Sequence, residues 1–244
     1  ESVWKYESEW REMSDRVGFW ADMDNPYVTY HNDYIESVWW ALKQIWDKDL
    51  LYKGHKVVPY CPRCGTALSS HEVAQGYKDV KEMSVYAKFK VEGKDNEYIL
   101  AWTTTPWTLP SNVALVVNAN ETYVKVKYDG EVLIFAEALV KTVLGEEAEY
   151  EILESFKGEK LQGTRYLPLF DFLENDAKGF YVVTDDYVTL TDGTGVVHTA
   201  PAFGEDDARV GHKYDLPFRQ YVNNQGEMTE EVKPWTGMFV KDAD

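Results

Sequence analysis

From about residue 80 the chain is a series of short apolar segments that suit β-strands, and this feature limits the possible folds most. The segments are rich in β-branched and aromatic residues and are separated by turn-forming residues. They are MSVYAKFKVEG, EYILAWTTT, VALVV, TYVKVKYDG, EVLIFA, FYVVT and GTGVVHTA. Many short strands with a few helices are typical of an α+β fold, so we expect a β-barrel-like domain over residues 80–240 with flanking helices.

Local signals place one hairpin and two helices among these strands. Asp129-Gly130 in KYDGEVLIF is a two-residue hairpin turn signal. AEALVKTVLG predicts a short helix that ends at Gly145. FGEDDARVGHKYDLP predicts a second helix, which opens on acids and closes before Pro217.

Residues 1–55 differ in character and predict a helical connecting arm. Apolar residues recur at helical spacing in VWKYESEWREMSDRVGFW and in DYIESVWWALKQIWDKDLLYKG, where Gly54 is the expected stop. The segment ADMDNPY interrupts the pattern between them. An aromatic stripe of this kind packs against a neighbour, and the number of tryptophans on one face indicates that the neighbour is another domain.

The charge of the chain excludes one class of function. The net charge is −17, whereas a free-standing nucleic-acid binder needs a basic surface to neutralise phosphates. A pocket that takes only the tip of a nucleic acid remains possible.

No apolar run is long enough for a membrane span, and the N-terminus has neither an initiator Met nor a signal-peptide pattern. We therefore expect a soluble, monomeric piece of a longer protein, without a membrane partner.

The two cysteines, Cys61 and Cys64, form the pattern YCPRCG. A two-residue gap lets both thiolates reach one ion, so the pattern predicts half of a zinc knuckle within a linker over residues 56–79. The alternatives are a site completed by His55 or His71, a redox pair, or a plain turn. With half of the ligands, the chain alone is expected to bind zinc weakly or not at all.

The stretch AWTTTPWTLPSN, residues 101–112, places three threonines directly before a proline. Pro106 favours an extended Thr105 and cannot donate to a ladder, so the strand ends there. The hydroxyls of Thr103, Thr104, Thr105 and Thr108 and the unpaired backbone groups could bind a polar substrate and polarise a carbonyl. The alternative is an ordinary strand that enters a proline turn.

The stretch DGTGVVHTAPAFGEDD, residues 192–207, supplies a complementary set of groups. A buried strand ends near His198, and an acidic helix start follows at Glu205 to Asp207. His198 could instead be a satisfied core residue, and the acids could serve the helix dipole alone. Together the two stretches are the parts of an acyl-hydrolysis pocket. No nucleophile elbow occurs, so water is the expected attacking group.

WTTTPWTLPSN together with GTGVVHTAPAFGEDD resembles the editing domain of isoleucyl-tRNA synthetases, the connective polypeptide insertion of this class I aminoacyl-tRNA synthetase family. The resemblance covers essentially all 244 residues, including YCPRCGTALSSHEVAQGY. Neither adenylate-forming signature of the family, His-Ile-Gly-His or Lys-Met-Ser-Lys-Ser, is present in the chain. The resemblance implies an editing site without the synthetic site.

That resemblance implies a reaction, because isoleucine and valine differ by one methylene. A hydrophobic pocket discriminates such a pair by only about 1–3 kcal/mol, and this family is the established example of the problem. The whole enzyme would ligate isoleucine to tRNA with ATP. The editing site would hydrolyse the ester of mischarged valyl-tRNA(Ile) by a positioned water, while isoleucine is excluded sterically.

The resemblance also implies roles for individual residues. Asp207 matches the carboxylate that pairs with the substrate α-ammonium, and at a helix start it is expected to stay ionised. Thr104 and Thr105 match the strand that contacts the ester and places water, and His198 matches a histidine of the pocket wall. The remaining substrate-binding positions are Thr103, Trp107, Thr108 and Asn112, with Asn112 supportive and Trp107 either a wall or a core residue.

The implied partners are the 3′ end of mischarged tRNA(Ile), its valyl-adenosine moiety, and the catalytic domain of the same polypeptide, in the cytoplasm. No cofactor is expected in the editing pocket. Cys61 and Cys64 match the first half of a structural zinc site that a second cysteine pair completes in the full-length enzyme. Two other interpretations stay open: a module that binds the tRNA end without hydrolysis, and a zinc-dependent structural adaptor.

Overall fold

The computed structural model describes residues 2–173 and 178–244, which belong to two compact units. The first unit is Glu1–His55 and the second is Lys56–Asp244. Within the described residues, no helix is long and apolar enough to cross a membrane.

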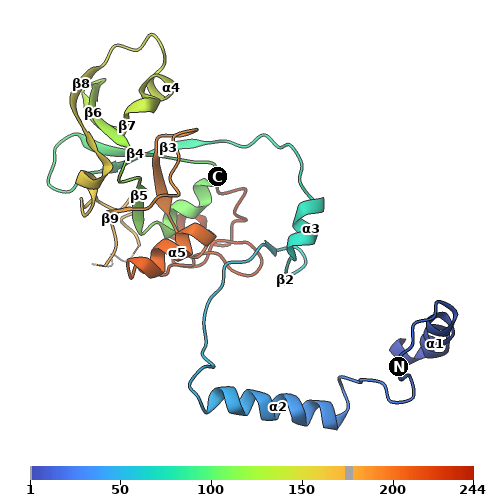
Figure 1. The fold of residues 1–244 in the computed structure, drawn as a ribbon. Helices are drawn as coiled ribbons and strands as arrows, with labels where there is room; N and C mark the ends of the chain where they lie inside the picture. Colours follow the sequence, from blue (N-terminus) through green and yellow to red (C-terminus); the bar gives the residue numbers. More distant parts are fainter. Residues whose placement is uncertain (1, 174–177) are drawn as a thin grey trace. The chain divides into compact units, whose positions relative to one another are not determined.

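The first unit is helical, as predicted. It contains a 3-10 turn, η1 (Ser2–Tyr6), followed by α1 (Glu7–Arg16) and α2 (Asn32–Trp46), shown in blue in Figure 1. No residue of α1 or α2 is buried, so the apolar stripe of α2 faces solvent within this unit. The predicted end of the second helix at Gly54 is wrong. Helix α2 ends at Trp46, and Asp49 takes a left-handed φ of 54°, which a continuing helix does not allow.

The second unit begins with a small knuckle. Strands β1 (Tyr60–Cys61) and β2 (Thr66–Ala67) pair as an antiparallel hairpin, and α3 (Ser70–Gln75) follows. Ser69 caps α3 in a capping box with Glu72, which satisfies two backbone N–H groups at the helix start.

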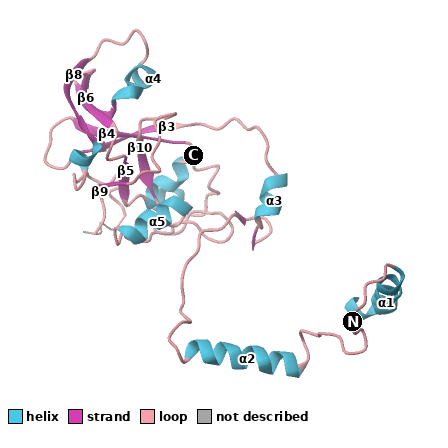
Figure 2. Ribbon diagram, in the orientation of Figure 1, coloured by secondary structure: helices cyan, strands magenta, loops and turns pink. Residues whose placement is uncertain are grey.

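Two open sheets form the body of the second unit (Figure 2). The larger sheet has the order β3-β4-β7-β6-β8 and the smaller has the order β10-β5-β9. The pairs β4–β7 and β5–β9 are parallel, and the other pairs are antiparallel. The strands are β3 (Val85–Lys90), β4 (Glu97–Thr103), β5 (Ala114–Val117), β6 (Thr122–Tyr128), β7 (Glu131–Ala136), β8 (Glu151–Lys157), β9 (Tyr181–Thr184) and β10 (Val196–Thr199).

Side-chain alternation explains how these sheets stack. Leu115 and Val117 of β5 pack with the larger sheet in the main core, whereas Ala114 and Val116 pack on the opposite side with Val210 of α5 (Glu205–Lys213). A third cluster joins the far face of the larger sheet to α4 (Val140–Leu144). The layers are therefore α4, larger sheet, smaller sheet and α5. Because both faces of β5 are buried, its sequence is a continuous apolar run, VALVV, without polar alternation.

The expected mixture of strands and helices is confirmed, but neither sheet closes among the described residues, so β-barrel-like is only a loose description. All seven predicted strands are present. The hairpin is confirmed as well, with Asp129 and Gly130 at φ of 47° and 80° between β6 and β7. Strand β8 was not predicted. It lies at the edge of the larger sheet with most residues exposed, so it lacks a clear apolar alternation.

The described part of this unit also contains four 3-10 segments: η2 (Pro106–Ser111), η3 (Glu137–Leu139), η4 (Gly158–Leu161) and η5 (Lys233–Trp235). The short helix predicted before Gly145 is confirmed as η3 and α4, with Gly145 at a φ of 99°. The acidic helix start is also confirmed, since α5 opens with Glu205, Asp206 and Asp207.

Candidate functional site

The ends of β4 and β10 lie beside each other and frame a cleft of about 300 Å³. Strand β4 leads into η2, and β10 leads through a short turn into α5. The lining residues come from both stretches singled out in the sequence: Trp102, Thr103, Thr104, Thr105, Thr108, Val197, His198, Ala200, Phe203 and Asp207. The structure thus brings the threonine hydroxyls and the Asp207 carboxylate to one cavity, although about a hundred residues of chain separate them.

The threonines differ in how their hydroxyls are used. Thr103 is buried, and its Oγ1 accepts the backbone N–H of Thr105 at 3.1 Å. The Thr108 hydroxyl donates to the carbonyl oxygen of Thr105 at 2.8 Å. Thr104 is exposed at the cleft, and its hydroxyl has no hydrogen bond to any residue that the structure describes. The Thr104 hydroxyl is therefore available to a ligand.

His198 is a neutral wall residue. Its Nε2 lies 2.8 Å from the Thr108 hydroxyl oxygen. Because that hydroxyl donates to Thr105, the oxygen accepts the hydrogen bond from Nε2–H, and the Nδ1 atom carries the lone pair. Burial lowers the pKa of His198 to about 4. The imidazole is consequently uncharged near neutral pH, and its buried Nδ1 has no partner among the described residues.

Asp207 is the third residue of α5, and its carboxyl group is positioned by the chain before the helix. A Cβ at Gly204 would lie 2.3 Å from Oδ2 of Asp207, so a side chain at position 204 would displace the Asp207 carboxyl group. The backbone N–H of Ala200 hydrogen-bonds the carboxylate. Burial and the nearby Asp206 nonetheless raise the pKa of Asp207 to about 7. The expectation that the helix start keeps Asp207 ionised is wrong, because desolvation outweighs the helix dipole here.

Because the pKa of Asp207 is raised in the folded protein, its ionised carboxylate is expected to lower the free energy of unfolding above about pH 7. The folded state holds the Asp207 proton more tightly than the unfolded chain, where the pKa is about 3.8. Proton binding at Asp207 therefore stabilises the folded state at low pH, and this stabilisation is lost as the pH rises from about 4 to about 7. Asp207→Asn is expected to raise the free energy of unfolding at pH 8 by on the order of 2 kcal/mol. Urea unfolding of both proteins at pH 4.5 and pH 8 measures this, and equal gains at the two values would contradict it.

Trp107 does not line the cleft. Its ring packs edge-to-face on Phe203 at a centroid distance of 5.1 Å, and its backbone N–H donates to Asp244. It lines a second cavity of about 470 Å³ together with parts of 56–62 and 220–226. Because Phe203 borders both cavities, Trp107 supports the cleft wall from behind.

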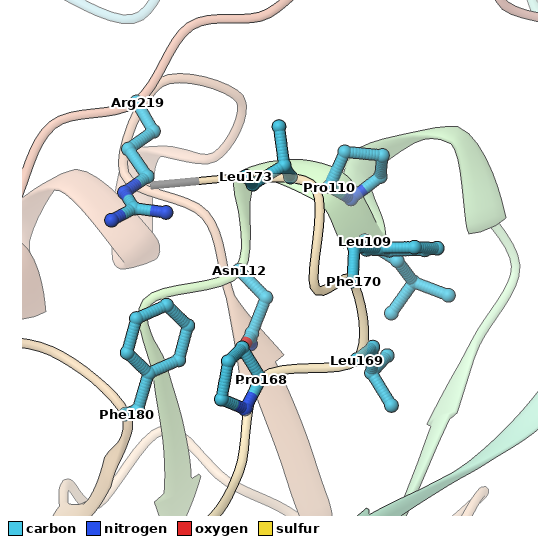
Figure 3. A pocket seen from close by; sticks show the side chains of 9 residues that line it. All are labelled: Leu109, Pro110, Asn112, Pro168, Leu169, Phe170, Leu173, Phe180 and Arg219. Atoms are coloured by element: carbon cyan, nitrogen blue, oxygen red, sulfur yellow. The ribbon is translucent and has the colours of Figure 1, made fainter. Parts of the chain in front are cut away.

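Asn112 lies away from the cleft as well. Its Nδ2 donates to the Ala114 carbonyl at 2.9 Å, and its Oδ1 accepts the Tyr166 hydroxyl at 2.7 Å. The side chain is buried and borders a small cavity on another side of η2, where Figure 3 shows it between Phe180 and Leu109. In this structure Asn112 holds the junction between η2 and β5.

Four cleft residues were not singled out by the sequence argument: Trp102, Val197, Ala200 and Phe203. They supply the apolar part of the wall. Trp102 and Val197 also border a neighbouring cavity of about 300 Å³. Gly193 lies close to the Trp102 ring, where a Cβ would be 2.9 Å away, and the glycine itself was the available sequence signal for a close approach here.

The two cysteines lie at the turn of the knuckle hairpin. The Cys64 backbone N–H donates to Sγ of Cys61 at 3.4 Å, and this contact lowers the pKa of the Cys61 thiol. Gly65 closes the turn with a φ of 69°. Two thiolates suit zinc, which needs four ligands, but no group of three or more metal-binding side chains occurs in the described part of the chain. The half zinc site expected from the sequence therefore stays a prediction.

Comparison with known families and proteins gives consistent matches. The family model of tRNA synthetases class I (I, L, M and V) matches residues 1–231. An isoleucine–tRNA ligase of Clostridium acetobutylicum is 67% identical over all 244 residues, and that of Clostridium novyi is 66% identical. The isoleucine–tRNA ligase 2 of Bacillus anthracis is 54% identical. The chain spans 23% of the length of each of these relatives.

Two solved structures show a weaker likeness. The crystal structure of GlLeuRS-CP1 matches with a TM-score of 0.45 and 16% identity, over 55% of this chain and 63% of that one. A cytosolic leucyl-tRNA synthetase editing domain of P. knowlesi matches with a TM-score of 0.43 and 16% identity, over 54% and 64%. Both scores are below 0.5, so these likenesses do not define the fold of this chain.

Proposed function

The chain belongs to the class I tRNA synthetases (I, L, M and V), and on that premise we propose that it is the editing region of an isoleucyl-tRNA synthetase. Its reaction is the hydrolysis of the ester bond in valyl-tRNA(Ile). The ligation of isoleucine to tRNA with ATP belongs to the whole protein in the cytoplasm, and this chain spans 23% of the length of its Clostridium acetobutylicum relative.

The observation that supports this proposal most is the cleft itself. Its lining contains threonine hydroxyls on one side and one carboxylate, Asp207, from the start of α5. An aminoacyl ester carries a cationic α-ammonium next to its carbonyl group. Asp207 binds that ammonium, and the bound cation favours the ionised carboxylate despite its pKa of about 7 in the free protein. Anchored in this way, the ester carbonyl lies near the threonines.

The chemical step is attack by water. The water oxygen adds to the ester carbonyl carbon, the bond from that carbon to the ribose oxygen breaks, and a proton from water ends on the ribose oxygen. The hydroxyls of Thr104 and Thr105 hold the water and stabilise the negative charge that develops on the carbonyl oxygen. His198 is neutral at the working pH, and it contributes a hydrogen-bonding wall.

Selection against isoleucine is steric. The apolar wall formed by Trp102, Val197 and Phe203 receives the valine side chain. One extra methylene in a packed space costs about 1–3 kcal/mol, and an intruding methylene in a rigid site can also displace the ester from the water. The cleft is therefore expected to act on valyl esters in preference to isoleucyl esters.

A deacylation assay tests this function. The protein is incubated with valyl-tRNA(Ile) and with isoleucyl-tRNA(Ile), and amino-acid release is followed over time. We expect release of valine at least about 10-fold faster than release of isoleucine, since one methylene decides between them. Equal release of both, or no release at high protein concentration, contradicts the proposed function.

A further inference from the structure

A network of ion pairs joins α5 to the end of β9. Asp185 directly follows β9, and its side chain is 7% exposed. The Arg209 guanidinium of α5 donates to both Asp185 oxygens, at 3.0 Å and 2.8 Å, and lies over the Tyr187 ring. Lys213, one turn further along α5, donates to the same carboxylate at 3.0 Å. The bidentate contact therefore holds the guanidinium in one orientation.

The guanidinium held in this way reaches a second carboxylate. Nη2 of Arg209 lies 3.2 Å from Oδ1 of Asp206, three residues earlier in α5. Asp206 directly precedes Asp207, the only carboxylate that the described residues contribute to the cleft lining. An exposed ion pair between two flexible side chains is weak, because ordering both side chains costs entropy. Asp185 has already ordered Arg209, so less entropy opposes its pairing with Asp206.

Asp206 is the charged group through which this network acts on Asp207. Burial and then the negative charge of Asp206 raise the pKa of Asp207. Two other titratable groups near Asp207 are neutral: His198, whose pKa is lowered by burial, and Tyr187, whose pKa is raised by burial and then by Asp207 itself. Glu205 is exposed, so water and salt screen its charge. The threonine stretch contributes no titratable group to the cleft.

We propose that Arg209 is a positioning residue of the editing site: its guanidinium, held by Asp185, pairs with Asp206 and thereby shields the neighbouring Asp207 from a like charge. Arg209 itself does not line the cleft. The shielding keeps a larger fraction of Asp207 ionised near neutral pH, and the ionised form is the one that binds a cationic amine. The consequence for hydrolysis rests on the proposed function, whereas the effect on Asp207 is a property of the free protein.

A carbon-13 NMR titration of the Asp207 carboxyl group in the free protein tests the proposal, with the Asp207→Asn spectrum for assignment. Asp206→Asn is expected to lower the pKa of Asp207 by about 0.5 pH unit, and Arg209→Met to raise it by about the same amount, the size typical of exposed charge pairs. The double variant has no charge at position 206 left to shield. Its Asp207 is therefore expected to titrate as in Asp206→Asn alone.

Three results would overturn the proposal: an unchanged Asp207 pKa in Asp206→Asn, an unchanged pKa in Arg209→Met, or the same rise from Arg209→Met when Asn stands at position 206. Arg209→Met is also expected to lower the melting temperature, since Asp185 keeps only Lys213 as an ion-pair partner. A lower melting temperature without a change in the Asp207 pKa means that Arg209 only ties α5 to β9.

Arg165→Met is the matched control for the charge. It removes a guanidinium from an exposed ion pair with Glu92 that does not line the cleft, and it should leave the pKa of Asp207 unchanged. With valyl-tRNA(Ile) at pH 7, kcat/KM of Arg209→Met should fall about twofold, and the difference should close above about pH 8.5. If the NMR changes appear but no variant hydrolyses the ester, the proposed function fails while the role of Arg209 stands.

Discussion

The Asp207→Ala variant is expected to hydrolyse valyl-tRNA(Ile) at least about 100-fold more slowly than the unaltered protein, while it remains folded. Asp207 contributes the only carboxylate to the lining of the cleft among the described residues. Its loss leaves the substrate ammonium without an ionic partner, and charge-assisted hydrogen bonds are the strong ones. The ester then no longer lies in register with the threonines, so kcat/KM falls.

Glu205→Ala is the matched control for this prediction. Glu205 lies in the same first turn of α5, is exposed and does not line the cleft, so its removal makes the same change in charge without touching the substrate. Its activity is expected to stay within about twofold of the parent, since surface changes of this kind are small. An Asp207→Ala protein that deacylates at the parental rate would falsify the anchoring role.

A pH series separates anchoring from a general loss of structure. The pKa of Asp207 is about 7 in the free protein, so the carboxylate is protonated progressively below that value. At subsaturating substrate, kcat/KM of the unaltered protein should fall from pH 8 to pH 6, because the neutral acid binds the ammonium poorly. The Asp207→Ala protein lacks the titrating group, so its kcat/KM should not show the fall between pH 8 and pH 6 that Asp207 causes.

The local elements of the fold could be predicted because their signals are local. The Asp129-Gly130 turn, the end of β4 before Pro106 and the acidic start of α5 each depend on a few neighbouring residues. The pairing of the strands could not be predicted in this way. The parallel pairs β4–β7 and β5–β9 join segments far apart in the chain, and alternation within one strand does not identify its partner.

The candidate site was predictable in outline, but its details depend on tertiary structure. The predicted end of the strand before Pro106 is confirmed, but the sequence argument did not predict the 3-10 helix that begins at Pro106. In a 3-10 helix residues three apart share a face, so Thr105 and Thr108 lie together while Trp107 points elsewhere. The pKa of Asp207 depends on burial by the chain around Ala200 and Gly204, which no local pattern reveals.

Replacing both Thr104 and Thr105 by valine is expected to slow hydrolysis by about 100-fold or more with a modest loss of stability. Each change removes a hydroxyl and keeps a β-branched shape, so the extended backbone before Pro106 is retained. Removal of one donor that stabilises a developing oxyanion costs about 10²–10³-fold in rate. Single-turnover deacylation measures the chemical step, and circular dichroism with thermal unfolding measures the fold.

The single variants then distinguish a catalytic hydroxyl from a structural one. The Thr104 hydroxyl has no partner among the described residues, so Thr104→Val should lower kcat without changing the melting temperature. The Thr105 hydroxyl lies 3.3 Å from that of Thr103, so Thr105→Val should affect both quantities. Thr66→Val, at a threonine that is also exposed but lies in the knuckle hairpin, is the control and should change neither. If Thr104→Val keeps the parental kcat, then the Thr104 hydroxyl does not contact the reacting ester, and the threonine stretch acts as scaffold only.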